Sequence, residues 1–183
     1  MDYFIEIRLQ KNQEIRPNLL LNNVYTNLHK RLYDVQTKSI GVSFPDYRIT
    51  LGNRIRIHGN NEDLTLFNSV DWLGDLKKFC QIGDMERIPQ DVQYRTISRV
   101  QSTMSQAKLR RLIKRGTIDE ADVKKYKIEM LKKGLDNPYV ELVSASNGKL
   151  HRRYFQFGDL QSEGVSGEFD SFGLSKQATV PWF

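Results

Sequence analysis

The sequence predicts an α+β protein, and three observations lead to that class. Stretches in which apolar and polar residues alternate, as in strands, are interspersed with stretches in which apolar residues recur about every fourth position, as in helices. Over the first 90 residues these stretches follow the order strand, helix, strand, strand, helix, strand, which is the ferredoxin-like (βαββαβ) order. Beyond residue 90 the alternation starts again and surrounds an arginine-rich helix. We therefore expect a ferredoxin-like domain over residues 1–90 and a C-terminal α/β domain over residues 91–183.

The first elements of the N-terminal domain have regular patterns. Residues 3–9 place apolar side chains at alternate positions, which predicts a half-buried strand. After Pro17, a residue tolerated in the first turn of a helix, apolar residues recur every four positions. This predicts a helix of about five turns that ends before Thr37. Residues 40–44 and 54–58 alternate again on either side of a turn-forming segment, which is typical of an antiparallel pair.

The remaining elements of this domain are shorter. An apolar cluster over residues 61–70 predicts a second helix, and residues 72–79 either continue that helix or form a separate turn. A further strand is expected between Ile82 and Ile88. The sequence Pro-Gln-Asp at 89–91 is the expected boundary between the two domains.

The C-terminal domain begins with alternating residues at 94–101, followed by a predicted helix over 105–115. Thr117 and Glu120 have the spacing of a capping box and would open another helix that continues to about Lys133. Further strands are expected at 139–144, at 150–157 and in the aromatic C-terminal tail, 180–183.

Basic side chains are concentrated in one segment of this second domain. Residues 95–115 contain no acidic residue but seven basic ones, Arg95, Arg99, Lys108, Arg110, Arg111, Lys114 and Arg115. Such a density of like charge is self-repelling unless an anion lies nearby. On a helix, basic residues one, three and four positions apart share one side. We therefore expect a nucleic-acid partner, the alternative being an ordinary solvated basic face.

Composition excludes several classes of protein. The chain has 183 residues and a formal charge of +6, and it contains no apolar run of the roughly 20 residues that a membrane span needs. The acidic N-terminus does not resemble a signal peptide, so a cytoplasmic location is expected. The single cysteine, Cys80, allows no intramolecular disulfide and no site with several thiolates. The three histidines, His29, His58 and His151, lack metal-ligand spacing, so neither a metal nor another cofactor is expected.

Nuclease chemistry without a metal points to RNA, whose 2′-hydroxyl can attack the adjacent phosphate after a base removes its proton. His29, at the edge of the apolar stripe of the first helix, is either that base or a structural residue. Ser144 and Ser146, where a strand ends in a loop, could position a ligand or form a turn. Arg99 and Gln101 share one strand face and suit guanine and adenine edges, although an ordinary exposed face has the same pattern.

Several short motifs keep a characteristic order and spacing over the whole chain. They are Met1-Asp2, Leu28-His29, the stretch from Ile40 to Pro45, Leu51-Gly52, and the stretches from Arg54 to His58, from Ser98 to Gln101, from Gly173 to Lys176 and from Val180 to Phe183. With these motifs the chain resembles, from end to end, the CRISPR-associated endoribonuclease of type I-F systems, which cuts precursor CRISPR RNA within its repeats.

This resemblance implies a ferredoxin-like N-terminal domain and an arginine-rich helix that docks in the major groove of the repeat hairpin. It also implies metal-independent cleavage at the base of the hairpin by 2′-hydroxyl attack, leaving a 5′-hydroxyl and a 2′,3′-cyclic phosphate. The protein would then stay bound to the mature guide RNA, together with the other subunits of the type I-F surveillance complex. No cofactor is implied.

The resemblance also implies roles for individual residues. His29 falls on the catalytic histidine, Ser144 on the serine that restrains the attacking nucleotide, and Ser146 beside it in a supporting role. Arg99 and Gln101 fall on the pair that recognises purines at the base of the stem. The residues expected to bind RNA from the basic helix are Lys108, Arg110, Arg111, Lys114 and Arg115.

Two positions depart from the family pattern. Some members carry a tyrosine near the C-terminus that orients the histidine, and the matching residue here is Phe172, which keeps the ring and loses the hydroxyl. Where an aromatic residue stacks on the terminal base pair, this chain has His151. If Phe172 disables the site, the alternative to an active enzyme is a non-catalytic hairpin-binding subunit. A DNA-binding regulator is a third hypothesis.

Overall fold

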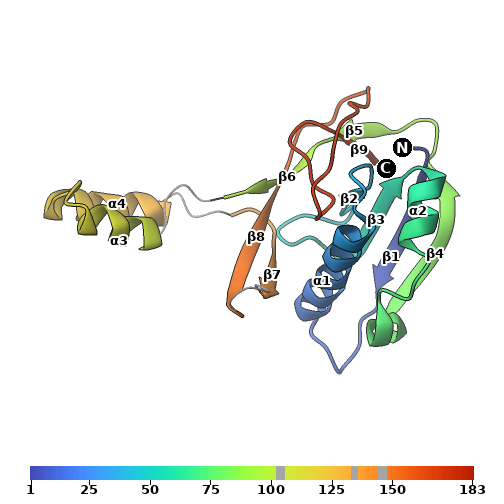
Figure 1. Cartoon of the computed structure of the whole chain (residues 1–183), viewed down its shortest axis with the longest axis horizontal. Coiled ribbons are helices and arrows are strands. Elements are labelled where there is room, and N and C mark those ends of the chain that lie inside the picture. The colour runs from blue at the N-terminus through green and yellow to red at the C-terminus, as the bar shows by residue number, and fades with distance from the viewer. Residues whose placement is uncertain (102–105, 133–135, 144–147) are drawn as a thin grey trace. The chain divides into compact units, whose positions relative to one another are not determined.

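The predicted mixture of helices and antiparallel sheets is confirmed in the computed structural model, which describes residues 1–101, 106–132, 136–143 and 148–183 (Figure 1). The chain divides into two compact units, Met1–Arg99 with Asn137–Phe183, and Val100–Asp136. None of the helices in these ranges is long and apolar enough to span a membrane.

The first unit contains a four-stranded antiparallel sheet with the strand order β2-β3-β1-β4. Its strands are β1 (Tyr3–Leu9), β2 (Gly41–Ser43), β3 (Arg54–Gly59) and β4 (Cys80–Arg87). The element order β1-α1-β2-β3-α2-β4 is the predicted one. The central position of β1 follows from its residues, because Ile5 and Ile7 are buried and pair with β3 on one side and β4 on the other.

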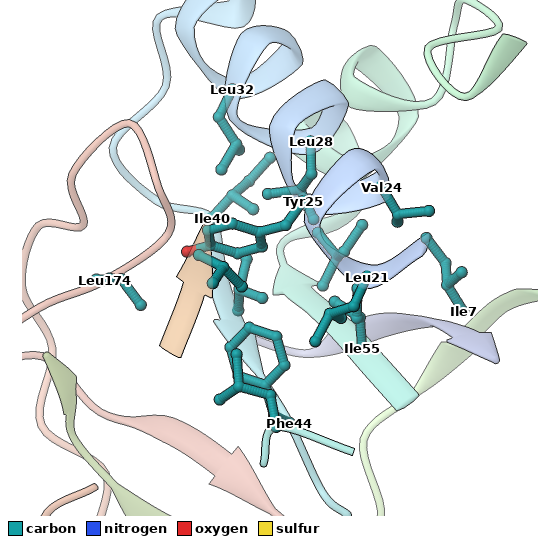
Figure 2. Packing of buried hydrophobic residues seen from close by; sticks show 14 of the residues in the cluster. Ile7, Leu21, Val24, Tyr25, Leu28, Leu32, Ile40, Phe44, Ile55 and Leu174 are labelled. Carbon is teal, nitrogen blue, oxygen red and sulfur yellow. The ribbon is translucent and has the colours of Figure 1, made fainter. Parts of the chain in front are cut away.

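Two α-helices and a 3₁₀ helix connect these strands: α1 (Pro17–Val35), α2 (Asn61–Phe67) and η1 (Gly74–Phe79). The apolar stripe of α1 is buried as predicted and packs with side chains of β1 and β3, as Figure 2 shows for Leu21, Val24, Ile7 and Ile55. Of the two predictions for the second helical region, the separate turn is correct. Burying such a stripe is the main source of helix stability in a protein.

The later strands of the chain complete the same unit. A two-stranded sheet pairs β5 (Gln93–Arg95) with β9 (Val180–Trp182), and a three-stranded sheet has the order β6-β8-β7. The three-stranded sheet consists of β6 (Ile97–Val100), β7 (Tyr139–Val143) and β8 (Leu150–Phe157).

The boundary expected near residue 90 does not coincide with the division between the two compact units. Phe155 of β8 is fully buried, and its ring lies 5.6 Å from that of Tyr25 and 5.2 Å from that of Phe44. The backbone N–H of Glu141 also donates a 3.0 Å hydrogen bond to the side chain of Asn22 in α1. The shared core and this bond explain why residues 137–183 belong with the first 99.

The second unit contains α3 (Gln106–Lys114) and α4 (Glu120–Lys132), close to the two predicted helices. Leu109 is buried, and Gly116 after α3 has a φ of 64°, a conformation that favours glycine. The predicted cap is wrong. Asp119 accepts a 2.8 Å hydrogen bond from the backbone N–H of Asp122, so its carboxylate caps α4 in place of Thr117.

Candidate active site

The histidine predicted to act as a base stacks on the phenylalanine predicted to orient it. His29 lies on α1, Phe172 lies in the segment between β8 and β9, and their ring centroids are 3.5 Å apart with an angle of 10° between the planes. The fold therefore brings together two of the four predicted catalytic residues. The other two, Ser144 and Ser146, lie outside the residues that the structure describes.

A tight turn holds Phe172 in place. The carboxylate of Asp170 accepts hydrogen bonds from the backbone N–H groups of Phe172, at 2.9 Å, and of Leu174, at 3.0 Å. Between these residues Gly173 has a φ of 70°, and a Cβ there would lie 3.1 Å from the backbone nitrogen of Val42. A residue with a side chain would be strained by both features, so the turn requires glycine.

Tyr25 connects this turn to α1. Its hydroxyl donates a 2.8 Å hydrogen bond to the carbonyl oxygen of Phe172, and its ring is fully buried. Burial also raises the pKa of the Tyr25 hydroxyl, so this group stays protonated and remains a donor. Because Tyr25 and His29 are four positions apart on α1, they lie on the same side of the helix. Both therefore face the turn that carries Phe172.

The hydrogen bonding of His29 determines which ring nitrogen can accept a proton. Its Nδ1 lies 2.7 Å from the carbonyl oxygen of Ser171. A carbonyl oxygen only accepts, so Nδ1 carries the hydrogen and, in the neutral ring, Nε2 is the nitrogen with a lone pair. This is the tautomer that a base acting through Nε2 requires.

The surroundings of His29 also favour its neutral form. Burial lowers the pKa of the half-buried imidazole, and the positive charge of Arg153 lowers it further. The bond to Ser171 and the charge of Asp170 act in the opposite direction, and the net shift is downward from the ordinary value of 6.5. His29 therefore remains able to accept a proton at neutral pH.

The residues predicted to recognise the RNA stem lie at and after the end of β6. Both residues are exposed, but Gln101 follows the last residue of β6, so only Arg99 lies within the strand. The charge of Arg99 contributes to lowering the pKa of Arg153, so Arg99 lies within electrostatic range of the histidine site. His151 is half-buried on β8, two residues from Arg153 and therefore on the same face of that strand.

The residues predicted for the basic helix are grouped as expected. The basic face of α3 comprises Lys108, Arg110, Arg111, Lys114 and, directly after the helix, Arg115, and all five are exposed. These residues lie in the compact unit Val100–Asp136, whereas His29 and Phe172 lie in the other unit. Within the ranges that the structure covers, no group of three or more His, Cys, Asp or Glu residues could hold a metal ion.

Sequence reasoning missed three participants in the site: the carbonyl of Ser171, the hydroxyl of Tyr25 and the guanidinium of Arg153. The backbone carbonyl has no sequence signal. Tyr25 lies in the apolar stripe that predicts the first helix, and a tyrosine in a buried stripe usually needs a partner for its hydroxyl. Arg153 has a weak signal, since in the predicted strand 150–157 it shares a face with Phe155 and Phe157.

Comparison with known proteins identifies a matching family and similar curated proteins. Residues 4–183 match the family described as "CRISPR-associated protein (Cas_Csy4)". Two curated relatives carry the name "CRISPR-associated endonuclease Cas6/Csy4". The one from Pseudomonas aeruginosa (strain UCBPP-PA14) is 36% identical over 187 residues, and the one from Escherichia coli (strain UTI89 / UPEC) is 34% identical over 184 residues. Each alignment covers 100% of this chain and 100% of the relative.

Among solved structures, "Crystal structure of CRISPR RNA processing endoribonuclease Cas6b" matches 98% of this chain and 100% of that chain. Its TM-score is 0.33 and its sequence identity is 12%.

Proposed function

This chain belongs to the Cas_Csy4 family of CRISPR-associated proteins, and on that premise we propose that it is an endoribonuclease that cuts precursor CRISPR RNA at the base of the repeat hairpin. The observation that carries this proposal is the state of His29. Its Nδ1 donates to the Ser171 carbonyl, and its surroundings lower its pKa, so Nε2 is available as a base. A histidine held in one tautomer and kept neutral suits general-base catalysis.

In the proposed reaction, Nε2 of His29 removes the proton from the 2′-hydroxyl of the nucleotide 5′ of the scissile phosphate. The resulting O2′ attacks phosphorus while the bond from phosphorus to O5′ breaks, and O5′ takes up a proton from the imidazolium or from water. The products are a 2′,3′-cyclic phosphate and a 5′-hydroxyl. The nucleophile comes from the RNA itself, so no metal is needed to generate it.

Other residues would support this step. Phe172 orients the imidazole by stacking, as its 3.5 Å separation from His29 favours. Ser144 restrains the attacking nucleotide and Ser146 assists it. Arg99 and Gln101 would recognise purines at the base of the stem.

Binding of the hairpin is assigned mainly to residues outside the reacting centre. His151 would stack on the terminal base pair, and the basic face of α3 would dock in the major groove. Phosphate contacts from exposed arginine and lysine supply much of the affinity of such complexes, and they make it dependent on salt. After cleavage the protein would stay on the guide RNA with the other subunits of the type I-F complex, in the cytoplasm.

We also propose that residues 1–90 are a ferredoxin-like domain and residues 91–183 the RNA-hairpin-binding domain, with β8 of the latter packed into the core that it shares with the former. The sheet order β2-β3-β1-β4 and the connection of its strands by α1 and α2 support the first assignment. The exposed basic face of α3 supports the second.

One observation favours a second candidate, a non-catalytic hairpin-binding subunit of a CRISPR or transposon-associated guide complex. Phe172 cannot form the hydrogen bond that a tyrosine hydroxyl would supply at this position. Incubating the protein in excess EDTA with the CRISPR repeat from the same locus distinguishes the two candidates. The enzyme cuts this RNA and leaves a cyclic phosphate, whereas the subunit binds the hairpin and leaves it intact.

A further inference from the structure

A third side chain extends the stack of His29 and Phe172. Arg153 lies on β8, and the carbon of its guanidinium group is 3.3 Å from the centroid of the Phe172 ring. His29 lies over the same ring with its centroid at 3.5 Å, so the two groups must occupy opposite faces. We call this arrangement of His29, Phe172 and Arg153 the His29 column. It joins residues from α1, from the loop before β9 and from β8.

The placement of Arg153 is costly for the fold. Arg153 is only 6% exposed, and its buried Nε has no hydrogen-bond partner among the residues that the structure describes. A buried cation without full hydrogen bonding is unfavourable, and attraction to the face of an aromatic ring offsets part of that cost. An apolar residue of similar length would fill the same space without the penalty. Packing alone therefore does not account for an arginine here.

We propose that Arg153 is a positioning residue for RNA cleavage that acts on His29 through Phe172. This inference rests on the proposed function. The guanidinium holds one face of the ring, and the other face holds the imidazole parallel to it. Phe172 has no hydroxyl, so its ring can be held only through contacts with its two faces. The guanidinium of Arg153 supplies the contact on one face.

The charge of Arg153 also affects the pKa of His29, and this effect can be measured. Around His29, the charge of Arg153 lowers its pKa, while the charge of Asp170 and the bond to the Ser171 carbonyl raise it. Farther out, Arg99 acts on Arg153 itself. Removing the charge of Arg153 leaves the two raising influences opposed by burial alone. The pKa of His29 should then rise, and more of the base should be protonated at neutral pH.

The test compares Arg153→Met and Arg153→Lys with Arg152→Met as the matched control. Arg152 is the neighbouring arginine on β8, is exposed, and pairs with Glu141 at 3.0 Å. Hairpin RNA is bound first, and the rate of the single cut is then measured from about pH 5 to about pH 9. Binding affinity and thermal unfolding are measured on the same samples.

With Arg153→Met, we expect cleavage near neutral pH to slow by about tenfold, the scale of effect that loss of precise positioning produces. The rise of the rate with pH should move to higher pH, while hairpin affinity changes less than about threefold. Arg153→Lys keeps the charge and not the planar stack, so it should slow the cut and leave the pH profile near that of the wild type. Arg152→Met should keep the wild-type pH profile.

A folded Arg153→Met protein that binds the hairpin and cuts it with the wild-type rate and pH profile would overturn the proposal. If Arg153→Met does not fold, Arg153→Lys decides: a wild-type cleavage rate in that variant has the same meaning, because lysine cannot lie flat on the ring.

The column can also be tested without cleavage, which separates its failure from failure of the proposed function. In the free wild-type protein, NMR signals of the His29 ring protons should be shifted upfield by the Phe172 ring and should titrate below the ordinary range. Arg153→Lys should change the upfield shift. Ordinary chemical shifts in the wild type would contradict the His29 column. If the shifts show the column but the protein does not cut the RNA, only the proposed enzymatic function is contradicted.

Discussion

The His29 column and the basic face of α3 differ in how much of the chain each one needs. The column joins three elements that are distant in sequence, and its members are buried or half-buried. The basic face arises within nine residues of one helix and the residue that follows, and its side chains are exposed. The difference suggests a division of labour in which the column sets the rate of the cut and the helix sets the affinity for RNA.

The largest expected effect comes from the column. His29→Ala should slow cleavage of the bound hairpin by about 10²- to 10⁴-fold, because a general base contributes roughly that factor. Hairpin affinity should stay nearly unchanged, since the imidazole makes few contacts in the ground state. Single-turnover cleavage and a binding titration measure the two quantities. A loss of affinity beyond about tenfold would show that His29 is structural, and the division of labour would fail.

The basic face should show the opposite response. Arg111→Ala or Arg115→Ala should weaken hairpin binding and reduce the salt dependence of log K by about one unit, as for the loss of one phosphate contact. Cleavage of RNA that is already bound should keep the wild-type rate. Titrations at several salt concentrations provide the test. Weaker binding with an unchanged salt slope would mean that these side chains pack the helix, and the docking proposal would be wrong.

These two regions also show how far sequence reasoning reaches. Repeats every four residues predicted α1, and the absence of acids over 95–115 predicted the basic face, because both signals are local. The bond from Tyr25 to Phe172 and the approach of Arg153 join distant residues, and no pattern within one element encodes them. Phe4 is a further example.

On β1, Phe4 lies on the face expected to be polar, yet it is buried against Phe183 of the C-terminus, with ring centroids 5.0 Å apart. The alternation in residues 3–9 identified the strand and one of its buried faces. Only the folded chain shows that the last residue covers part of the other face. The cap of α4 was missed for a smaller reason, since Asp119 and Thr117 are both good capping residues and lie two positions apart.

A smaller effect tests whether the column depends on the fold around it. Tyr25→Phe removes the donor to the Phe172 carbonyl and should lower the free energy of unfolding by about 1–2 kcal/mol, because a buried acceptor loses its partner. Tyr33→Phe is the control, since Tyr33 is 61% exposed on the same helix and should change stability by less than about 0.5 kcal/mol. Urea unfolding measures both. Equal values for the two variants would show that the bond does not hold the turn.

The smallest effect is expected from adding a hydroxyl to the ring at position 172. Phe172→Tyr keeps the ring that stacks on His29 and adds a group worth about one hydrogen bond, or about 1 kcal/mol. The rate at which the bound hairpin is cleaved should therefore change by no more than about fivefold in either direction. A gain of a hundredfold or more would show that stacking alone leaves the site nearly inactive, and would favour the non-catalytic subunit for the natural chain.

The central claim, that His29 activates a hydroxyl of the RNA, is tested most directly by one substrate. A repeat hairpin with a single 2′-deoxy nucleotide 5′ of the scissile phosphate lacks only the proposed nucleophile. We expect the wild-type protein to bind this hairpin with nearly normal affinity, because one hydroxyl contributes little beside many phosphate contacts, and to leave it uncut. Cleavage of this hairpin at the unchanged position would exclude 2′-hydroxyl attack, and with it the role assigned to His29.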